Sequence, residues 1–216
     1  MEDSFKHKGR RKRLVEYLKE KGISNEKVLD ALLEVPRHFF FPKDFWDDAY
    51  EDKAFPIGSG QTISQPYTVA FQTQLLSPKP GDIVLEIGTG SGYQAAILSA
   101  MGVKVYTVER VEELFRSTTA LFKKLKLPVH CFLGDGSQGL PSKGPFNGIV
   151  VTAGGNDLAE QLKEQLVIGG RLVVPMGNRS IQKMVLIQKH VENNYERTEH
   201  GDFKFVPLLG KYGWKT

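Results

Sequence analysis

Short apolar runs alternate with longer amphipathic segments through the second half of the chain, beginning near Gly81. Strands are expected at five apolar runs, namely 83–87, 103–108, 129–133, 149–152 and 172–175. Helices are expected at three amphipathic segments between them, namely 93–101, 111–125 and 158–166. Such alternation predicts an α/β fold with a doubly wound, mostly parallel sheet and helices on both faces.

The first third of the chain predicts helices rather than strands. One helix is expected over 10–21 and would end at Gly22. A second should begin after an N-cap at Ser24 and end before Pro36, because proline disfavours helical backbone in the preceding residue. An irregular aromatic stretch and a polar loop containing Gly58 follow, before the next expected helix.

The last part of the chain predicts antiparallel structure. Segments 183–189 and 195–199 flank two asparagines in the manner of a hairpin, and 203–206 predicts a final short strand. We expect one domain over 1–216. Its predicted parts are an N-terminal helical cap and loop (1–66), an α/β core (67–180) and C-terminal strands (181–216).

Composition excludes several classes of protein. Hydrophobic residues make up 40% of the chain and charged residues 25%, an ordinary globular balance. The single cysteine, Cys131, permits no intramolecular disulfide and fits a cytoplasmic protein. No apolar run approaches the roughly 20 residues that a membrane helix needs. We therefore expect an intracellular protein that has no membrane partner and needs no metal.

The net charge of +4 is confined to the N-terminus. Residues 1–13 carry six basic and two acidic side chains, so the rest of the chain is neutral. We interpret 1–13 as a solvated, frayed tail; an electrostatic arm for an anionic partner is the alternative. A neutral body also argues against nucleic-acid binding, which depends on cationic contacts to phosphates.

The strongest chemical signal is a buried strand that enters a glycine-rich turn and then a helix, Val84-Leu85-Glu86-Ile87-Gly88-Thr89-Gly90-Ser91-Gly92-Tyr93. Doubly wound folds bind nucleotides at such a turn. Dinucleotide sites place their third glycine where Tyr93 stands, so a dinucleotide is disfavoured. A negative charge at Glu86 suits a ligand with an amino group and a sulfonium, and would repel a pyrophosphate.

Two further acids follow neighbouring strands. Glu109 ends the second core strand, 21 residues after Gly88, where an acid can accept both hydroxyls of a ribose. A solvated glutamate at a helix start is the alternative. Asp135-Gly136 follows the third core strand, where the aspartate is either a ligand for a base or part of an ordinary β-turn.

These segments together resemble one methyltransferase family. The segments that carry the likeness are the turn sequence above, Gly58-Ser59-Gly60-Gln61-Thr62-Ile63-Ser64-Gln65-Pro66, Val35-Pro36-Arg37, Val108-Glu109-Arg110, Ile149-Val150-Val151-Thr152-Ala153, Gly169-Gly170-Arg171 and Phe205-Val206-Pro207-Leu208. The chain resembles protein-L-isoaspartate (D-aspartate) O-methyltransferases over roughly 28–210. The loop before the glycine motif is specific to that family, not to methyltransferases generally.

The resemblance implies a Rossmann-like methyltransferase that transfers the methyl group of S-adenosylmethionine to the free α-carboxylate of isoaspartyl residues. Its partners would be damaged proteins and peptides, and it would act as a monomer without a metal. Ser64 would be the catalytic-loop hydroxyl. The implied cofactor residues are Glu86, Gly88, Thr89, Gly90, Ser91, Gly92, Glu109, Asp135 and Gly136. The implied substrate residues are Gln61, Thr62, Ile63, Val206, Pro207 and Leu208.

The chain departs from the family pattern at a few positions. Gly154-Gly155-Asn156 replaces an alanine-rich segment, Asn147 replaces an aspartate, and Leu209 replaces a threonine. These departures leave two alternatives open: a relative that binds the cofactor without methylating, and a methyltransferase for another carboxylate. Ser64 also has a structural alternative, as the cap of the helix expected from Pro66 to Leu76.

Overall fold

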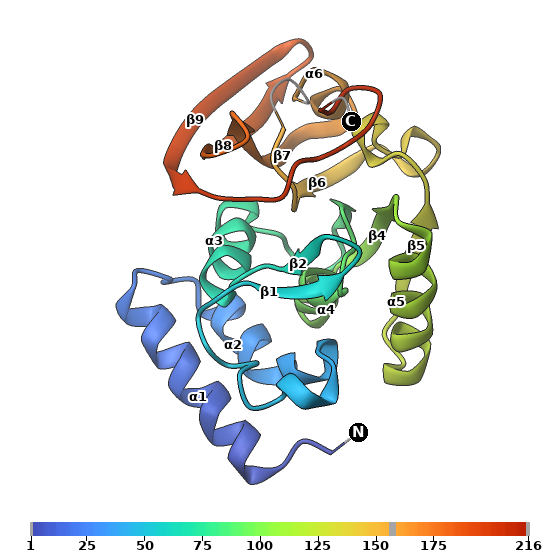
Figure 1. Ribbon diagram of the computed structural model, residues 1–216. Helices are drawn as coiled ribbons and strands as arrows, with labels where there is room; N and C mark the ends of the chain where they lie inside the picture. The colour runs from blue at the N-terminus through green and yellow to red at the C-terminus, as the bar shows by residue number, and fades with distance from the viewer. Residues whose placement is uncertain (1, 156–158, 215–216) are drawn as a thin grey trace.

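The computed structural model describes residues 2–155 and 159–214 and contains one seven-stranded sheet (Figure 1). The strand order is β5-β4-β3-β6-β7-β8-β9. The strands are β3 (Ile83–Ile87), β4 (Lys104–Glu109), β5 (Val129–Leu133), β6 (Phe146–Val151), β7 (Leu166–Gly177), β8 (Gln182–Val191) and β9 (Asn194–Phe203). The first five are parallel, and β8 and β9 extend the sheet as an antiparallel pair.

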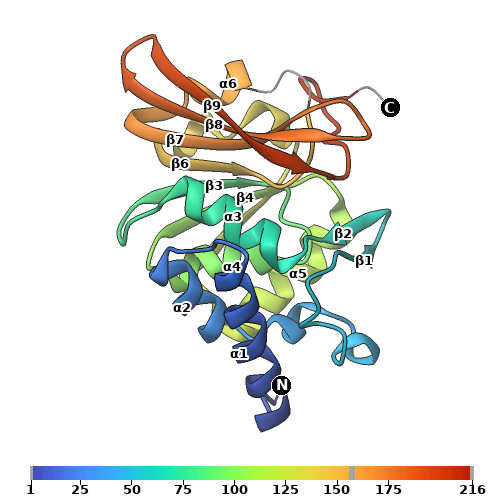
Figure 2. The same cartoon turned by 90° about the vertical axis from the view of Figure 1, so that its left-hand side faces the viewer.

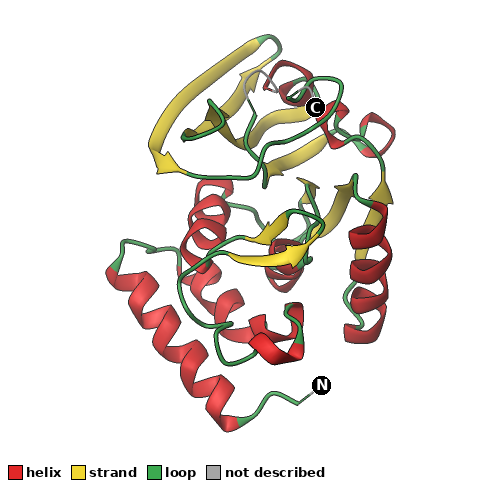
Figure 3. Ribbon diagram, viewed as in Figure 1, coloured by secondary structure: helices red, strands yellow, loops and turns green. Residues whose placement is uncertain are grey.

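The two faces of the sheet are covered unequally (Figures 2 and 3). Five helices pack on one face: α1 (Phe5–Glu20), α2 (Glu26–Glu34), α3 (Pro66–Leu76), α4 (Tyr93–Ala100) and α5 (Glu112–Leu125). The other face carries α6 (Ala159–Lys163) and the C-terminal segment. Neighbours in β3 separate by face: Val84 joins the five-helix core, and Leu85 joins the core beneath α6. This alternation is the pleat of a strand buried on both sides.

Most of the expected elements are confirmed. The predicted bounds of β3, β5 and α3 match, and the other core strands and helices differ at their ends. The predicted helix at 158–166 is observed over Ala159–Lys163, and its first residue lies outside the described residues. The expected strand at 203–206 is wrong, because Phe203 ends β9 and 204–206 form no strand.

The expected polar loop before α3 is a short hairpin instead. It consists of β1 (Phe55–Gly58) and β2 (Gln61–Ile63), which pair antiparallel. Gly58, Ser59 and Gly60 all have positive φ at the turn. Glycines at both ends of the reversal supply this backbone conformation without steric cost.

The predicted frayed tail is wrong. Ser4 caps α1 by accepting a hydrogen bond from the His7 backbone, so the helix begins five residues before the predicted start. Arg11 is buried and forms an ion pair with Asp3 at 2.9 Å. Its Nε also donates to the Leu33 carbonyl at 2.6 Å. The number of charges in 1–13 did not indicate this, because a charge count does not show that Arg11 is buried and paired with Asp3.

The predicted N-cap of α2 is displaced by one residue. Asn25, not Ser24, caps the helix, and its side chain accepts from Lys27 and Val28. Gln74 of α3 holds the backbone N–H groups of both Ser24 and Asn25. This tertiary contact fixes which polar residue becomes the cap.

Candidate active site

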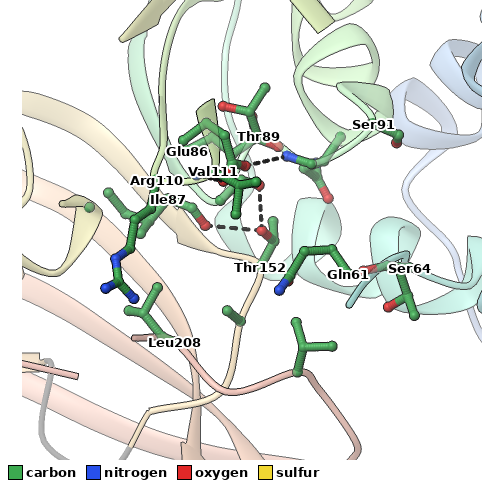
Figure 4. Close-up of a pocket in the computed structure, with 18 of the residues that line it drawn as sticks. Gln61, Ser64, Glu86, Ile87, Thr89, Ser91, Arg110, Val111, Thr152 and Leu208 are labelled. Atoms are coloured by element: carbon green, nitrogen blue, oxygen red, sulfur yellow. Dashed lines mark hydrogen bonds between the residues drawn. The ribbon is translucent and has the colours of Figure 1, made fainter. Parts of the chain in front are cut away.

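A cavity opens at the carboxyl ends of β3 and β4, beside the point between β3 and β6 where the strand order changes direction (Figure 4). Doubly wound folds form their ligand crevices at this position. The cavity brings together most predicted site residues: Gln61, Thr62, Ile63, Ser64, Glu86, Gly88, Thr89, Gly90, Ser91, Glu109, Gly136, Val206, Pro207 and Leu208. Figure 4 places Gln61 and Ser64 across the cavity from Ile87 and Arg110, with Thr152 between them.

The glycine turn after β3 requires glycine for steric reasons. Gly88, Gly90 and Gly92 all have positive φ. A Cβ at Gly88 would lie 2.6 Å from Thr152 Oγ1, which donates to the Gly88 carbonyl. A Cβ at Gly92 would lie 2.5 Å from the ring of Phe122. Gly92 does not line the cavity, so its part is to let the turn pass close to α5.

Glu86 is fully buried in the wall of the cavity. Burial raises the pKa of its carboxyl group to about 8, and the nearby Glu109 charge acts in the same direction, while the Thr107 hydroxyl opposes both. Oε2 accepts from Thr107 Oγ1 at 2.5 Å, and Oε1 has no hydrogen-bond partner among the described residues. An unpartnered buried acceptor is costly. A ligand carrying an ammonium or sulfonium charge would satisfy it.

Glu109 braces the glycine turn from the end of β4. Its Oε2 accepts from the Gly90 backbone and its Oε1 from the Val111 backbone, both at 2.8 Å. The side chain is 6% exposed and lines the cavity, so the alternative of a solvated helix-start glutamate is wrong. Each carboxylate oxygen retains a second lone pair, which leaves capacity for ribose hydroxyls.

Asp135 lies outside the residues that line the cavity, although Gly136 lines it. The Asp135 carboxylate accepts from the Ser137 backbone at 3.0 Å and from the Lys211 backbone at 2.8 Å. It therefore ties the C-terminal segment to the end of β5. A contact from Asp135 to a bound base stays a prediction.

Ser64 lies between β2 and α3 and lines the cavity. The N-cap of α3 is Gln65, and no side chain caps this helix. The capping alternative for Ser64 is therefore wrong. Its hydroxyl has no hydrogen-bond partner within the described chain, whereas its carbonyl accepts from Arg37 Nη2 at 2.8 Å. The hydroxyl remains available to a ligand.

The segment Val206–Leu208 closes the cavity from the C-terminal side and depends on Gly154. Gly154 N donates to the Val206 carbonyl, and Leu208 N donates to the Gly154 carbonyl, both at 2.8 Å. A Cβ at Gly154 would lie 3.0 Å from the side chain of Gln182. The glycine at 154, which departs from the family pattern, therefore leaves room for the Gln182 side chain beside the Val206–Leu208 segment. Asn147, another departure, accepts from the Ile83 backbone at 2.8 Å, and Asn156 lies outside the described residues.

Several residues of the cavity wall were not predicted as site residues: Val69, Ile87, Tyr93, Gln94, Val108, Arg110, Val111, Thr152, Ala153 and Leu209. Most of them stand inside a segment quoted above or directly beside one, so taking every residue of those segments and their neighbours as candidates would have found them. Val69 had no such signal, because it reaches the cavity from inside α3, whereas Gln94 directly follows the glycine motif at the start of α4.

One cluster outside the cavity has residue types that bind metals. Polar atoms of Asp3, His7 and His38 lie within 4.8 Å of one another. The Asp3 carboxylate is paired with Arg11, and His38 Nδ1 is hydrogen-bonded to Tyr50 at 2.7 Å. The two imidazoles stack with centroids 3.9 Å apart instead of converging on one point. These contacts anchor the start of α1.

Comparisons with known proteins agree on one family. A family model described as protein-L-isoaspartate(D-aspartate) O-methyltransferase matches residues 9–213. A protein-L-isoaspartate O-methyltransferase of Flavobacterium johnsoniae is 55% identical, covering 97% of this chain and 98% of the relative. That of Cytophaga hutchinsonii is 51% identical, covering 99% and 97%.

Two solved structures share the fold over nearly the whole chain. One protein-L-isoaspartate O-methyltransferase superposes with a TM-score of 0.82 at 29% identity, covering 94% of this chain and 67% of the other. A Plasmodium falciparum chain assigned to the same activity, solved with S-adenosyl-L-homocysteine, gives 0.79 at 27% identity and covers 94% and 98%. Within the described residues, no helix is both long and apolar enough to cross a bilayer.

Proposed function

Because this chain belongs to the protein-L-isoaspartate(D-aspartate) O-methyltransferase family, we propose that it methylates the free α-carboxylate of L-isoaspartyl residues. The observation that carries the proposal is the pairing of two features in one cavity. One wall holds the glycine turn with Glu86 and Glu109, and the opposite wall presents the unpartnered Ser64 hydroxyl.

The residues present fit S-adenosylmethionine, the family's cofactor, which supplies an electrophilic methyl group when bound. Glu86 offers an unpartnered carboxylate oxygen to a positive charge, and Glu109 offers lone pairs to ribose hydroxyls. The glycine turn lets the backbone approach the ligand closely at Gly88 and Gly90. Val111 lines the cavity beyond the end of β4, and Gly136 lines it beyond the end of β5.

The acceptor carboxylate needs no general base. A carboxyl group with a pKa near ~4 is already ionised at neutral pH. Consistently, no histidine, lysine or cysteine is found among the described residues of the cavity wall. The protein must hold the acceptor in line and exclude water, and positioning of this kind can contribute ~7–11 kcal/mol. Ser64 would donate to the carboxylate as it loses hydration, and the ester product would then cyclise to a succinimide without help.

The acceptor chain would lie between β2 and the segment Val206–Leu208. Gln61, Thr62 and Ile63 line one side of the cavity, and Val206, Pro207 and Leu208 line the other. An isoaspartyl peptide fits such a slot, because its α-carboxylate branches off the main chain and can enter the cavity while the chain stays outside. An ordinary aspartyl residue presents a side-chain carboxylate with different connectivity.

We also infer that the protein acts as a single-domain monomer in the cytoplasm, without nucleic acid. The chain outside 1–13 carries no net charge, which argues against binding to phosphates, and Cys131 is a free thiol, which fits the cytoplasm. Sedimentation at micromolar concentration should give the mass of one chain. A stable dimer would overturn the inference of a monomer.

An ester-formation assay tests the proposed activity. The protein is incubated with methyl-labelled S-adenosylmethionine and an isoaspartyl peptide, and base-labile label is measured as methanol. The aspartyl isomer of the same peptide is the control. Label from the isoaspartyl peptide alone supports the proposal. Cofactor binding without ester formation would support the alternative of a non-methylating relative.

A further inference from the structure

Arg37 is a fully buried cation held without an ion pair. It follows α2 in the short 3-10 helix η1 (Arg37–Phe40) and has 0% exposure. Burial lowers the pKa of its guanidinium to about 10. No carboxylate lies within ion-pair distance of it in the described chain. Burying an unpaired charge is strongly unfavourable, and an apolar side chain would fill the same volume at less cost. Stability therefore does not explain this residue.

The contacts of Arg37 join segments far apart in the sequence. Nε donates to the Ala49 carbonyl at 2.9 Å, and Nη2 donates to the Ser64 carbonyl at 2.8 Å. The guanidinium also lies over the ring of Tyr93, 4.6 Å from its centroid, and over that of Phe41 at 5.2 Å. Arg37 itself does not line the cavity.

Two of these contacts, with Ser64 and with Tyr93, involve segments that would hold the two different reactants. Ser64 carries the hydroxyl expected to hold the acceptor carboxylate. Tyr93 is the first residue of α4, directly after Gly92 of the turn that would hold the methyl donor. A guanidinium is planar and rigid, so one group in contact with both segments fixes the distance between them. Neither segment is hydrogen-bonded to the other in the described structure.

We propose that Arg37 is a positioning residue that sets the acceptor loop at Ser64 against the cofactor turn at Tyr93. The proposal rests on the proposed function, since it assigns acceptor and donor to these two segments. Methyl transfer needs an in-line approach of carboxylate oxygen and methyl carbon, and a displacement of about 1 Å from such geometry can cost ~10²-fold in rate. Loss of Arg37 should therefore lower kcat, while the acceptor site and the cofactor site each remain formed.

Four variants test this, each assayed with an isoaspartyl peptide well below its melting temperature. Arg37→Met removes every polar contact, and Arg37→Lys keeps the charge but not the planar fork. Lys189→Met is the matched control, because Lys189 is a buried cation on β8 that donates to the Leu166 carbonyl away from the cavity. Phe41→Leu keeps Arg37 and alters a ring against which the guanidinium packs, a ring that also contacts Phe55 of β1. It secures the test if the Arg37 variants do not fold.

We expect kcat to fall by about 10²-fold in Arg37→Met and by less in Arg37→Lys. The Kd of S-adenosylhomocysteine should stay within about twofold of wild type in both. Lys189→Met should keep its kcat even where its melting temperature drops, and Phe41→Leu should lower kcat severalfold. A wild-type kcat in folded Arg37→Met, or an equal loss in Lys189→Met, would overturn the positioning role. If the Arg37 variants do not fold, a wild-type kcat in Phe41→Leu overturns it. Absence of ester formation by the wild-type protein would instead overturn the proposed function.

Discussion

Thr107 Oγ1 donates a 2.5 Å hydrogen bond to Glu86 Oε2, while the other oxygen of this buried carboxyl group has no partner in the described structure. Burial raises the pKa of Glu86 to about 8, so in the free protein at neutral pH it is mostly protonated. A bound cation favours the ionised form and lowers that pKa.

Cofactor affinity should therefore depend on pH through Glu86. The affinity for S-adenosylmethionine should rise between about pH 6 and 8 and level off above the free-protein pKa. Glu86→Gln should bind more weakly at pH 8 and show little slope. Calorimetry in buffers of different ionisation enthalpy would also detect the released proton. A wild-type affinity that does not change with pH would contradict the role given to Glu86.

The same carboxyl group should make the free protein less stable as pH rises. Its pKa is about 8 in the folded protein, against an ordinary value of 4.5. Between these values the unfolded chain loses a proton that the folded protein keeps, so the free energy of unfolding falls with increasing pH. Thermal melts of ligand-free protein should show wild type losing stability relative to Glu86→Gln across this window. Parallel curves would show that Glu86 is not the group responsible.

Glu109→Ala should weaken S-adenosylmethionine binding by about 1.5–3 kcal/mol, the range for hydrogen bonds to a charged group. The variant loses the acceptor for ribose hydroxyls and also the brace on Gly90. Glu112→Ala is a suitable control, because Glu112 lies three residues further on and pairs with Arg116 at the surface. Unchanged affinity in folded Glu109→Ala, measured by calorimetry, would remove Glu109 from the site.

Ser64→Ala should lower kcat by ~10²-fold while leaving cofactor affinity almost intact, by analogy with the loss of one oxyanion donor. The melting temperature should hardly change, because Ser64 does not cap α3. Ser59→Ala, in the hairpin that precedes Ser64, is the control: Ser59 donates to Glu113 and does not line the cavity. Kinetics and melting on both variants decide the matter, and normal turnover in Ser64→Ala would exclude a catalytic role.

Arg11→Ala should destabilise the protein by about 3 kcal/mol, because it leaves Asp3 unpaired and removes a donor to the Leu33 carbonyl. Activity below the melting temperature should stay near wild type, since α1 does not reach the cavity. Lys12→Ala replaces an exposed neighbouring residue and should change neither the stability nor the activity. Denaturant titration checks the stability difference, and an unchanged unfolding midpoint in Arg11→Ala would show that this anchor is unimportant.

The pattern of apolar and polar residues predicted the core strands and helices, because each of these elements is encoded by a continuous run of residues. The turn after β3 was predictable because Gly88, Gly90 and Gly92 mark it directly after a buried strand. The side chains that crowd Gly88 and Gly92, Thr152 and Phe122, lie far along the chain and were not predictable. Features set by distant contacts were missed. In the sequence Arg11 is one of six basic residues, and only the folded chain brings it to Asp3 and the Leu33 carbonyl. Arg37 belonged to a family motif, yet nothing in the sequence showed that it contacts both Ser64 and Tyr93.

Product analysis of a peptide mixture shows directly which carboxylate the protein methylates. Equal amounts of an isoaspartyl peptide and its aspartyl isomer are incubated with the protein and S-adenosylmethionine, and the separated isomers are followed by fragmentation mass spectrometry. We expect that only the isoaspartyl isomer gains a methyl group, on its free α-carboxylate, and that this ester is then converted to the succinimide. Methylation of both isomers alike, of the aspartyl isomer alone, or of neither would contradict it.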